Sequence, residues 1–175
     1  NKGITYRKMW EQSDSDFSWL HFKWFTDHYK KFKEQHFLVD YTDMLDMYLL
    51  VDGSPRLDVL IIDEAQDLSS LQWSCVEKLA RYSKEIYVAG DDDQAIYTWA
   101  GADVQKFISL KGSKKVLNQS YRVPRKVHDI ALGVVNRIKT RIPKVWKPRK
   151  EEGGVYFHNK VEHIDMKEGE WLILA

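Results

Sequence analysis

The chain has 175 residues, and 27 lysine and arginine residues against 26 aspartate and glutamate residues leave a formal net charge of +1. Hydrophobic residues at 43% and charged residues at 30% can support a packed core, which argues against wholesale disorder. A single cysteine, Cys75, excludes an intramolecular disulfide and a cysteine-rich zinc site. No apolar run reaches the roughly 18 residues that a membrane span needs. We therefore expect a soluble, intracellular, mixed α/β protein with no membrane partner.

The N-terminal region is rich in aromatic residues. Between Phe17 and Phe37 their spacing is mostly three, four or seven, with lysines between them, which predicts one or two amphipathic helices. Aromatic rings interleaved with lysines can stack on nucleic-acid bases. A stripe of this kind more commonly faces a hydrophobic core, and we expect a core face here. Residues 43–50 continue as a helix, and a turn at 52–55 ends it.

Residues 57–119 alternate between strand and helix patterns. Short, β-branched apolar runs at 57–62 and 85–89 predict strands buried on both faces. The helix between them begins with cap residues at 67–70, and Cys75 is expected in its core-facing stripe. A short helix at 103–110 and a strand at 115–118 follow. This order predicts a parallel sheet covered by helices.

The C-terminal third begins with a helix from Pro124 to about residue 139, on which His128 is expected at the surface or as a cap. Two further strands are predicted at 153–157 and 171–175. Residues 111–150 carry thirteen lysines and arginines against one acidic residue, Asp129. Such a basic block suits a polyanion, and a solvated helix face with a linker is the alternative.

Polar residues follow the first two predicted strands. Asp63 and Glu64 end the first strand, at the edge where α/β folds bind ligands. Paired carboxylates there suit phosphoryl transfer, because one can help hold Mg²⁺ while the other orients or deprotonates water. Gln94 follows the second strand and is able to hydrogen-bond a terminal phosphate. Tyr97 and Trp99, just beyond it, are candidates for contacts with bases.

These segments resemble three motifs of the UvrD/Rep family of superfamily 1 helicases. Asp-Glu-Ala-Gln-Asp at 63–67 resembles motif II, the Walker B element, residues 90–102 resemble motif III, and residues 117–122 resemble motif IV. Residues 40–45 are similar to the segment that leads this family back into its first RecA-like core. The three motifs occur in the family's order and spacing.

The resemblance implies an α/β fold with a partial RecA-like (P-loop NTPase) parallel sheet flanked by helices, after a mainly helical N-terminal segment. Residues 1–40 would be the tail of the helical 1B subdomain. Residues 41–112 would form the C-terminal half of core domain 1A, with motifs II and III. Residues 113–175 would begin core domain 2A, with motif IV.

The resemblance also implies roles in nucleotide chemistry, with ATP and Mg²⁺ as cofactors. Asp63 would coordinate Mg²⁺, and Glu64 would be the catalytic base for the hydrolytic water. Gln94 would sense the γ-phosphate and couple hydrolysis to DNA binding. Arg122 would act as an arginine finger from the second core domain, and Tyr121 would stack on the adenine.

On the DNA side, the resemblance implies that Trp99 stacks on a base of the single strand and that Tyr97 contributes nearby. Two departures from the family pattern affect this side. Ala100 stands where family members commonly carry arginine, and Leu68-Ser69 replace a polar pair after motif II. Both departures concern DNA contacts and leave the nucleotide residues in place.

The P-loop pattern Gly-x-x-x-x-Gly-Lys-Ser/Thr does not occur in the chain. We therefore interpret the chain as an internal fragment that binds ATP weakly and does not hydrolyse it alone. The parent would be an ATP-dependent DNA helicase acting on single-stranded and partly duplex DNA, with 3′ to 5′ polarity implied by the family. It would be cytoplasmic, nucleoid-associated, and monomeric or weakly dimeric, and the resemblance names no protein partner.

Three other interpretations remain open. The parent could be the helicase subunit of an AddA/RecB-type helicase–nuclease, which shares these motifs. A degenerate, non-hydrolysing single-stranded DNA-binding module is a second possibility. An unrelated P-loop ATPase is the third, and it would not be expected to carry Gln94, Trp99 and Arg122 at these spacings.

Overall fold

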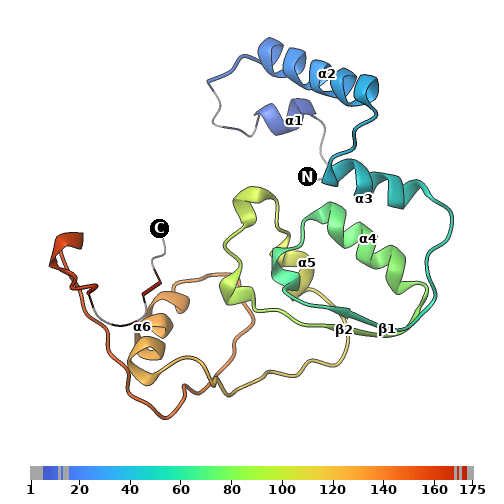
Figure 1. Cartoon of the computed structure of the whole chain (residues 1–175). Coiled ribbons are helices and arrows are strands. Elements are labelled where there is room, and N and C mark those ends of the chain that lie inside the picture. The colour runs from blue at the N-terminus through green and yellow to red at the C-terminus, as the bar shows by residue number, and fades with distance from the viewer. Residues whose placement is uncertain (1–5, 12, 14–15, 168, 170, 173–175) are drawn as a thin grey trace. The chain divides into compact units, whose positions relative to one another are not determined.

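The computed structural model describes residues 6–11, 13, 16–167, 169 and 171–172. It divides into two compact units, residues 1–112 and residues 113–175, and each is considered by itself. The first unit contains five α-helices and the only two strands in the described part of the chain (Figure 1). The second contains one α-helix, α6, and one short 3₁₀ turn among its described residues.

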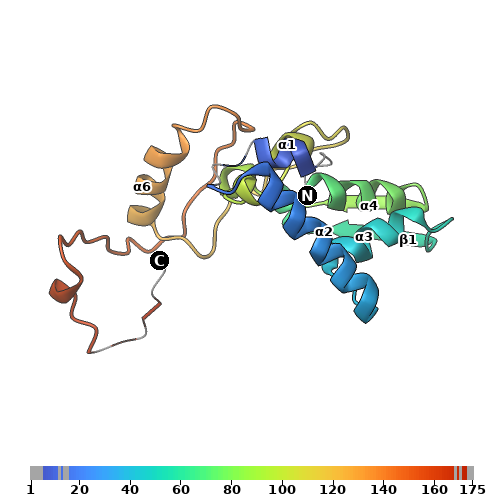
Figure 2. The ribbon, with the colours of Figure 1, turned by 90° about the horizontal axis from the view of Figure 1, so that it is seen from above.

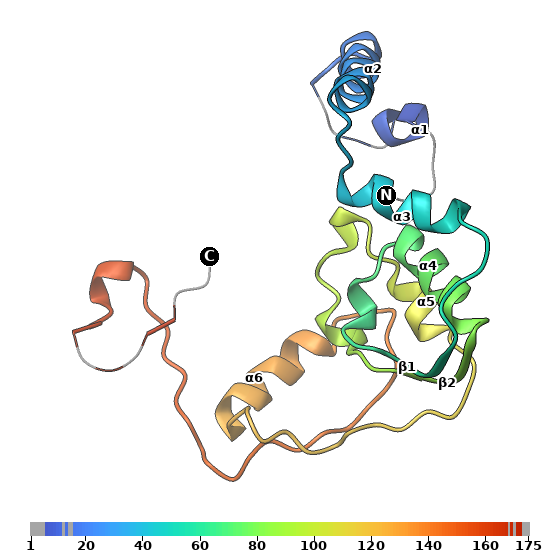
Figure 3. The same cartoon turned by 45° about the vertical axis from the view of Figure 1, so that its right-hand side comes forward.

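A strand–helix–strand unit forms the centre of the first unit. Strand β1 (Leu57–Ile62) pairs in parallel with β2 (Ser83–Val88), and α4 (Ser70–Ala80) connects them. Helix α3 (Tyr41–Leu50) packs on α4, which lies between α3 and the sheet (Figures 1 and 3). The prediction of parallel strands joined by a helix is therefore confirmed.

The buried core of this unit is small. It lies where α4 and the loop after β1 meet the sheet, and its apolar members are Leu60, Ala65, Leu71, Trp73 and Cys75. The expected core position of Cys75 is confirmed, and burial raises the pKa of its thiol. Helix α4 begins with a capping box, in which Ser69 Oγ accepts from the Gln72 backbone N–H and Gln72 Oε1 accepts from the Ser69 N–H.

The prediction that both strands are buried on two faces is wrong. Leu60 points into the core, but its neighbour Ile61 is 70% exposed, and Tyr87 opposite Ile61 is exposed as well. Side chains alternate between the two faces of a strand. Among the described residues, helices cover only the face that carries Leu60, so the other apolar face meets solvent.

The aromatic stripe near the N-terminus is helical, but it does not face a core. It lies on α2 (Trp19–His36), which follows α1 (Tyr6–Glu11) and has no buried residue. Its rings pack along the helix on each other: Trp24 stacks on His28 with centroids 4.0 Å apart, and Phe25 on Tyr29 at 6.3 Å. Spacing of four residues brings these rings together, so an exposed helix face reproduces the pattern expected of a core face.

Short turns complete the first unit. They follow the ends of the two strands: 3₁₀ turns at Ala65–Asp67, Asp92–Gln94 and Thr98–Ala100, then helix α5 at Val104–Ile108. Helix α5 is shorter than the predicted 103–110. The Asp103 side chain caps it by accepting from the Lys106 backbone N–H at 3.1 Å.

The second unit has one long element, α6 (Arg125–Val135), which starts one residue after the predicted Pro124, its N-cap, and ends before residue 139. The predicted strands at 115–118 and 153–157 are wrong, because neither segment forms a strand (Figure 2). In the described part of this unit, the only bridge joins Gln119 to Lys147. Residues 171–172 are not a strand either, and residues 173–175 of that prediction lie outside the described residues.

The two residues before 153–157 contact the start of α6. The carbonyls of Glu151 and Glu152 accept from the free backbone N–H groups of Arg125 and Lys126 in the first turn of α6, at 3.0 and 2.9 Å. These carbonyls thus accept hydrogen bonds from N–H groups that have no partner within the helix. The surface position expected of His128 is also wrong: it is buried, and its Nε2 lies 3.1 Å from the Trp146 carbonyl oxygen.

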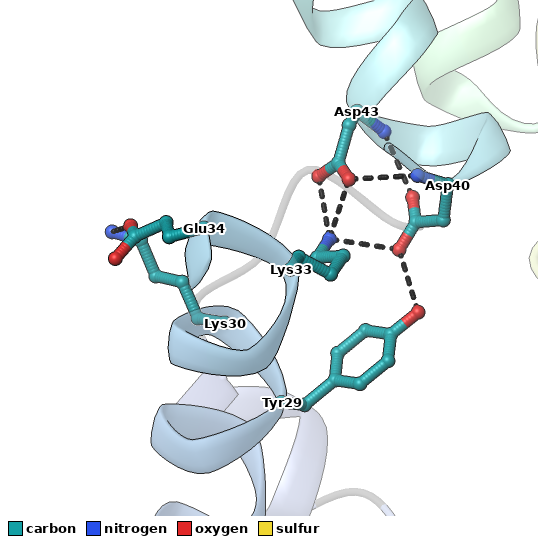
Figure 4. Close-up of polar contacts among 6 residues, drawn as sticks. All are labelled: Tyr29, Lys30, Lys33, Glu34, Asp40 and Asp43. Atoms are coloured by element: carbon teal, nitrogen blue, oxygen red, sulfur yellow. Dashed lines mark hydrogen bonds and ion pairs between the residues drawn. The ribbon is translucent and has the colours of Figure 1, made fainter. Parts of the chain in front are cut away.

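One ionic cluster joins α2 to α3 (Figure 4). Lys33 Nζ donates to Asp40 at 2.9 Å and to Asp43 at 2.5 Å, and the Tyr29 hydroxyl donates to Asp40 at 3.1 Å. Asp40 and Asp43 are also the two members of the capping box that starts α3. The Lys33 ammonium lowers the pKa of Asp40 to about 2, and the hydrogen bonds to Asp43 and Asp40 raise the pKa of Lys33.

We expect Lys33→Met to loosen the start of α3. The substitution leaves two neighbouring carboxylates without their shared counter-ion, so amide hydrogen exchange over residues 38–44 should become roughly two- to fivefold faster. Lys30→Met is the matched control on the same helix, since Lys30 lies 3.9 Å from Glu34 and both side chains are largely exposed (Figure 4). Equal exchange rates in the two variants would contradict a role for this cluster.

Candidate functional site

The ends of β1 and β2 bring two predicted motifs together. Beyond the strands, the Ala89 N–H donates to the Ile62 carbonyl at 2.8 Å, and the Ala65 N–H donates to the Ala89 carbonyl at 3.0 Å. The pairing thus continues past the last strand residues. As a result, residues 63–67 lie beside residues 89–91 at the carboxyl edge of the sheet, where parallel α/β folds bind ligands.

Asp63 and Glu64 are both exposed at this edge. Asp63 Oδ1 accepts from the Glu64 backbone N–H at 2.9 Å. Glu64 adopts the left-handed conformation, with φ of +50° and ψ of +39°, which costs a residue with a Cβ on the order of 1 kcal/mol. This turn ends the strand abruptly and leaves two adjacent carboxylates accessible to a ligand.

Gln66 connects these carboxylates to the second motif. Its side chain is 1% exposed, and Nε2 donates to Glu64 Oε2 at 2.8 Å and to Asp67 Oδ2 at 3.2 Å. Its Oε1 accepts from the Asp91 backbone N–H at 2.9 Å. Asp91 then accepts from Gln94 Nε2 at 2.6 Å, so the exposed Gln94 side chain is held against the same loop.

The sequence patterns did not single out Gln66. Asp91 also orients its own loop, because its Oδ1 accepts from the Asp93 N–H at 3.2 Å. No spacing rule points to Gln66, because its acceptor contact is 25 residues away in the chain. In the sequence, the only signal was that Gln66 lies among three carboxylate residues, Asp63, Glu64 and Asp67.

A cavity of about 330 Å³ lies next to this edge. Its lining comes from α3, the start of α4 and residues 97–102, and includes Asp67, Tyr97 and Ala100. Asp67 Oδ1 is buried and has no hydrogen-bond partner among the described residues. The candidate site therefore consists of the carboxylates at Asp63 and Glu64 and of this cavity, which Tyr97 helps to line.

The two predicted DNA-contacting residues are accessible. Trp99 is 79% exposed on the 3₁₀ turn Thr98–Ala100, and Tyr97 just before it is about half exposed. The Ala102 N–H donates to the Tyr97 carbonyl, and the Asp103 N–H donates to the Leu68 carbonyl at 2.8 Å. These bonds connect the turn that presents Trp99 to the segment after motif II.

The remaining candidates, Tyr121 and Arg122, belong to the second unit. Both side chains are exposed, and the Arg122 backbone N–H donates to Ser120 Oγ at 3.3 Å. The roles of Tyr121 and Arg122 toward a nucleotide stay predictions. The first unit alone brings together Asp63, Glu64 and Gln94.

No three histidine, cysteine, aspartate or glutamate side chains in the described part of the chain lie close enough to hold a metal ion by themselves. Mg²⁺ does not require such a cage, because it usually keeps several waters and binds one or two carboxylates together with phosphate oxygens. Asp63 and Glu64, both exposed and hard oxygen donors, fit an ion that arrives with a nucleotide.

Comparison with known proteins bears on this arrangement. Residues 6–115 match the model of the UvrD/REP helicase N-terminal domain, which is more than half of the chain. The chain belongs to the UvrD/REP helicase family. The matched residues contain Asp63, Glu64 and Gln94, and also the turn that carries Trp99.

Individual members of the UvrD/REP family are similar over most of the chain. It is 30% identical over 141 residues to the ATP-dependent DNA helicase PcrA of Leuconostoc citreum, which covers 71% of this chain and 19% of that protein. It is 29% identical over 126 residues to a probable DNA helicase II homolog of Mycoplasma pneumoniae, which covers 63% and 18%. PcrA of Staphylococcus aureus is 30% identical over 119 residues, covering 65% and 16%. The chain thus spans about a fifth or less of the length of these relatives.

Across the residues that the structure describes, none of the helices combines the length and the apolar character required to cross a membrane.

Close approach of the two motifs depends on Gly90. A Cβ at this position would lie 2.6 Å from Gln66 Oε1, 3.0 Å from Phe107 Cζ and 3.2 Å from the Ala65 nitrogen. We expect Gly90→Ala to lower the free energy of unfolding by about 1–3 kcal/mol, because buried Gln66 would have to move. Urea denaturation measures this cost.

Gly133→Ala on α6 is the matched control, since a Cβ there meets nothing within 4 Å. In a helix this change should stabilise by about 0.5–1 kcal/mol, so the two variants are expected to differ in sign. An unchanged free energy of unfolding in Gly90→Ala would show that the segments at 63–67 and 89–91 tolerate a wider separation.

Proposed function

We propose that this chain is part of an ATP-dependent DNA helicase that couples hydrolysis of Mg-ATP to movement along single-stranded DNA and to duplex unwinding. The observation that carries the proposal is the meeting of Asp63, Glu64 and Gln94 at one sheet edge. Membership of the UvrD/REP family, and relatives named ATP-dependent DNA helicases, support it. Movement from 3′ to 5′ is part of the proposal.

In this proposal Asp63 supplies a carboxylate oxygen to Mg²⁺. Glu64 takes the proton of the water that attacks the terminal phosphate, and its carboxylate is already oriented by Gln66. A bound Mg-nucleotide supplies the electrophilic phosphate and a charge that offsets the carboxylates. Gln94 donates its amide to the phosphate oxygens when it releases Asp91. The exposed location of all three side chains supports these roles.

Two residues of the second unit have proposed roles toward the nucleotide. We propose that Arg122 acts as an arginine finger and that Tyr121 stacks on the adenine. Both side chains are exposed and therefore available to a ligand.

The chain carries no P-loop, so it would lack the usual backbone cradle for the triphosphate. We propose that it is a segment of a longer helicase and does not hydrolyse ATP by itself. The chain's small share of its relatives' length supports this. The alternatives are a helicase–nuclease subunit, which would show the same DNA-stimulated ATP hydrolysis, and a non-hydrolysing DNA-binding module, which the ATPase experiment below separates from a helicase.

Glu64→Gln in the full-length protein should abolish DNA-stimulated ATP hydrolysis. Loss of the proton acceptor is expected to reduce kcat by about 100-fold or more, while binding of ATP is retained. Steady-state ATPase assays with and without single-stranded DNA measure this. Glu34→Gln, on the exposed surface of α2, is the control and should behave as wild type. A wild-type rate that ignores both DNA and the Glu64 substitution would favour the non-hydrolysing module.

Trp99→Ala should weaken binding of single-stranded DNA by about 1–3 kcal/mol, or roughly five- to hundredfold in Kd, through loss of one stacked base. The loss should be similar for thymine and adenine oligonucleotides, because stacking needs only a π face. Fluorescence anisotropy of labelled oligonucleotides measures Kd. Trp171→Ala, an exposed tryptophan outside the motifs, is the control. An unchanged Kd for Trp99→Ala would place the DNA track elsewhere.

A further inference from the structure

Gln66 is the most completely buried polar side chain among the described residues, and it sits between the two motifs. Burying an amide without hydrogen bonds is costly, whereas an apolar residue of similar size would fill the same space at no such cost. Here both ends of the amide are used: Nε2 donates to Glu64 and Asp67, and Oε1 accepts from Asp91. The residue therefore has a role that packing alone does not require.

The side-chain amide of Gln66 is one rigid, planar group, and its nitrogen and oxygen contact different segments of the chain. On one side lies the Glu64 carboxylate, whose residue has a left-handed backbone at an exposed strand end. On the other lies the Asp91 backbone, and the carboxylate of Asp91 holds Gln94 at 2.6 Å. Three hydrogen bonds thus connect the side chain of Glu64 to that of Gln94.

The link is built into the backbone as well. Gly90 lets the Gln66 amide approach, since any Cβ there would lie 2.6 Å from Oε1. The loop that starts at Asp91 continues to Tyr97 and the turn that carries Trp99. A displacement of this loop is therefore transmitted to Gln66 through the Asp91 N–H, and from there to Glu64.

We propose that Gln66 is a positioning residue that sets the Glu64 carboxylate relative to the loop after β2, so that Glu64 and Gln94 respond together when DNA moves that loop. The proposal rests on the proposed function and extends it. Gln66 itself touches neither nucleotide nor DNA. Its effect is on kcat and on stimulation by DNA rather than on binding of ATP.

Two substitutions in the full-length protein distinguish the contact of Gln66 with Glu64 from its contact with Asp91. Gln66→Met keeps the size of the side chain and removes all of its hydrogen bonds. Gln66→Glu keeps an oxygen that can accept from the Asp91 N–H but removes the hydrogens donated to Glu64 and Asp67. Gln35→Met is the control, because Gln35 is an exposed glutamine on α2 and lies outside the candidate site.

For Gln66→Met we expect kcat with single-stranded DNA to fall about tenfold, with KM for ATP within about twofold of wild type. Amide hydrogen exchange in a peptide covering residues 90–96 should become about tenfold faster. Gln66→Glu should lose kcat to a similar degree while exchange over residues 90–96 stays near wild type. Gln35→Met should leave both measurements unchanged.

A normal kcat in Gln66→Met would overturn the proposal, as would faster exchange with no change in kcat or an equal loss in Gln35→Met. If Gln66→Met fails to fold, Gln66→Glu decides: normal DNA-stimulated kcat in that variant overturns the proposal. If the wild type shows no DNA-stimulated hydrolysis, the proposed function fails first. In that case the exchange data still report whether Gln66 connects the two segments.

Discussion

The parallel pairing of β1 with β2 is the constraint on which the site depends. Parallel neighbours run in the same direction, so both chains leave the sheet at one edge, and α4 provides the crossover that this requires. The pairing continues through Ala65 and Ala89, which fixes the two following loops at backbone distance. Helix α3 and the capping box of α4 then secure the layer behind this edge. Without this register, residues more than twenty positions apart would have no reason to meet.

At this edge the chain changes from exposed to buried residues between Glu64 and Ala65. Asp63 and Glu64 are exposed, whereas the next two residues, Ala65 and Gln66, are almost fully buried. The left-handed backbone at Glu64 makes that switch possible within a single step. Its conformational cost is offset by the bonds that Ala65 and Gln66 make to the neighbouring loop. Strain at one residue thus keeps its carboxylate accessible while its neighbours anchor the turn.

Sequence patterns predicted strands at 57–62 and 85–89 and the helix between them, because β-branched runs and helical periodicity are local properties. The second strand in fact spans 83–88. The patterns failed at 115–118 and 153–157, since a strand also needs a partner, which no local pattern supplies. The aromatic stripe of α2 was assigned to a core because helical periodicity cannot distinguish a covered face from rings that stack on each other. Glu64 and Gln94 were predicted as site residues from their place after strands, and their roles stay predictions. Gln66 was not predicted, because its acceptor contact depends on tertiary structure.

The uncovered face of the sheet affects how this chain behaves outside a larger assembly. A two-stranded sheet is marginal in water, and unpaired strand edges beside exposed apolar residues such as Ile61 and Tyr87 promote self-association. The exposed ion pair between Asp58 and Lys84, at 2.5 Å, lies on the face that carries Leu60, so it does not cover Ile61 or Tyr87. Self-association of the isolated chain would therefore proceed through the uncovered apolar face.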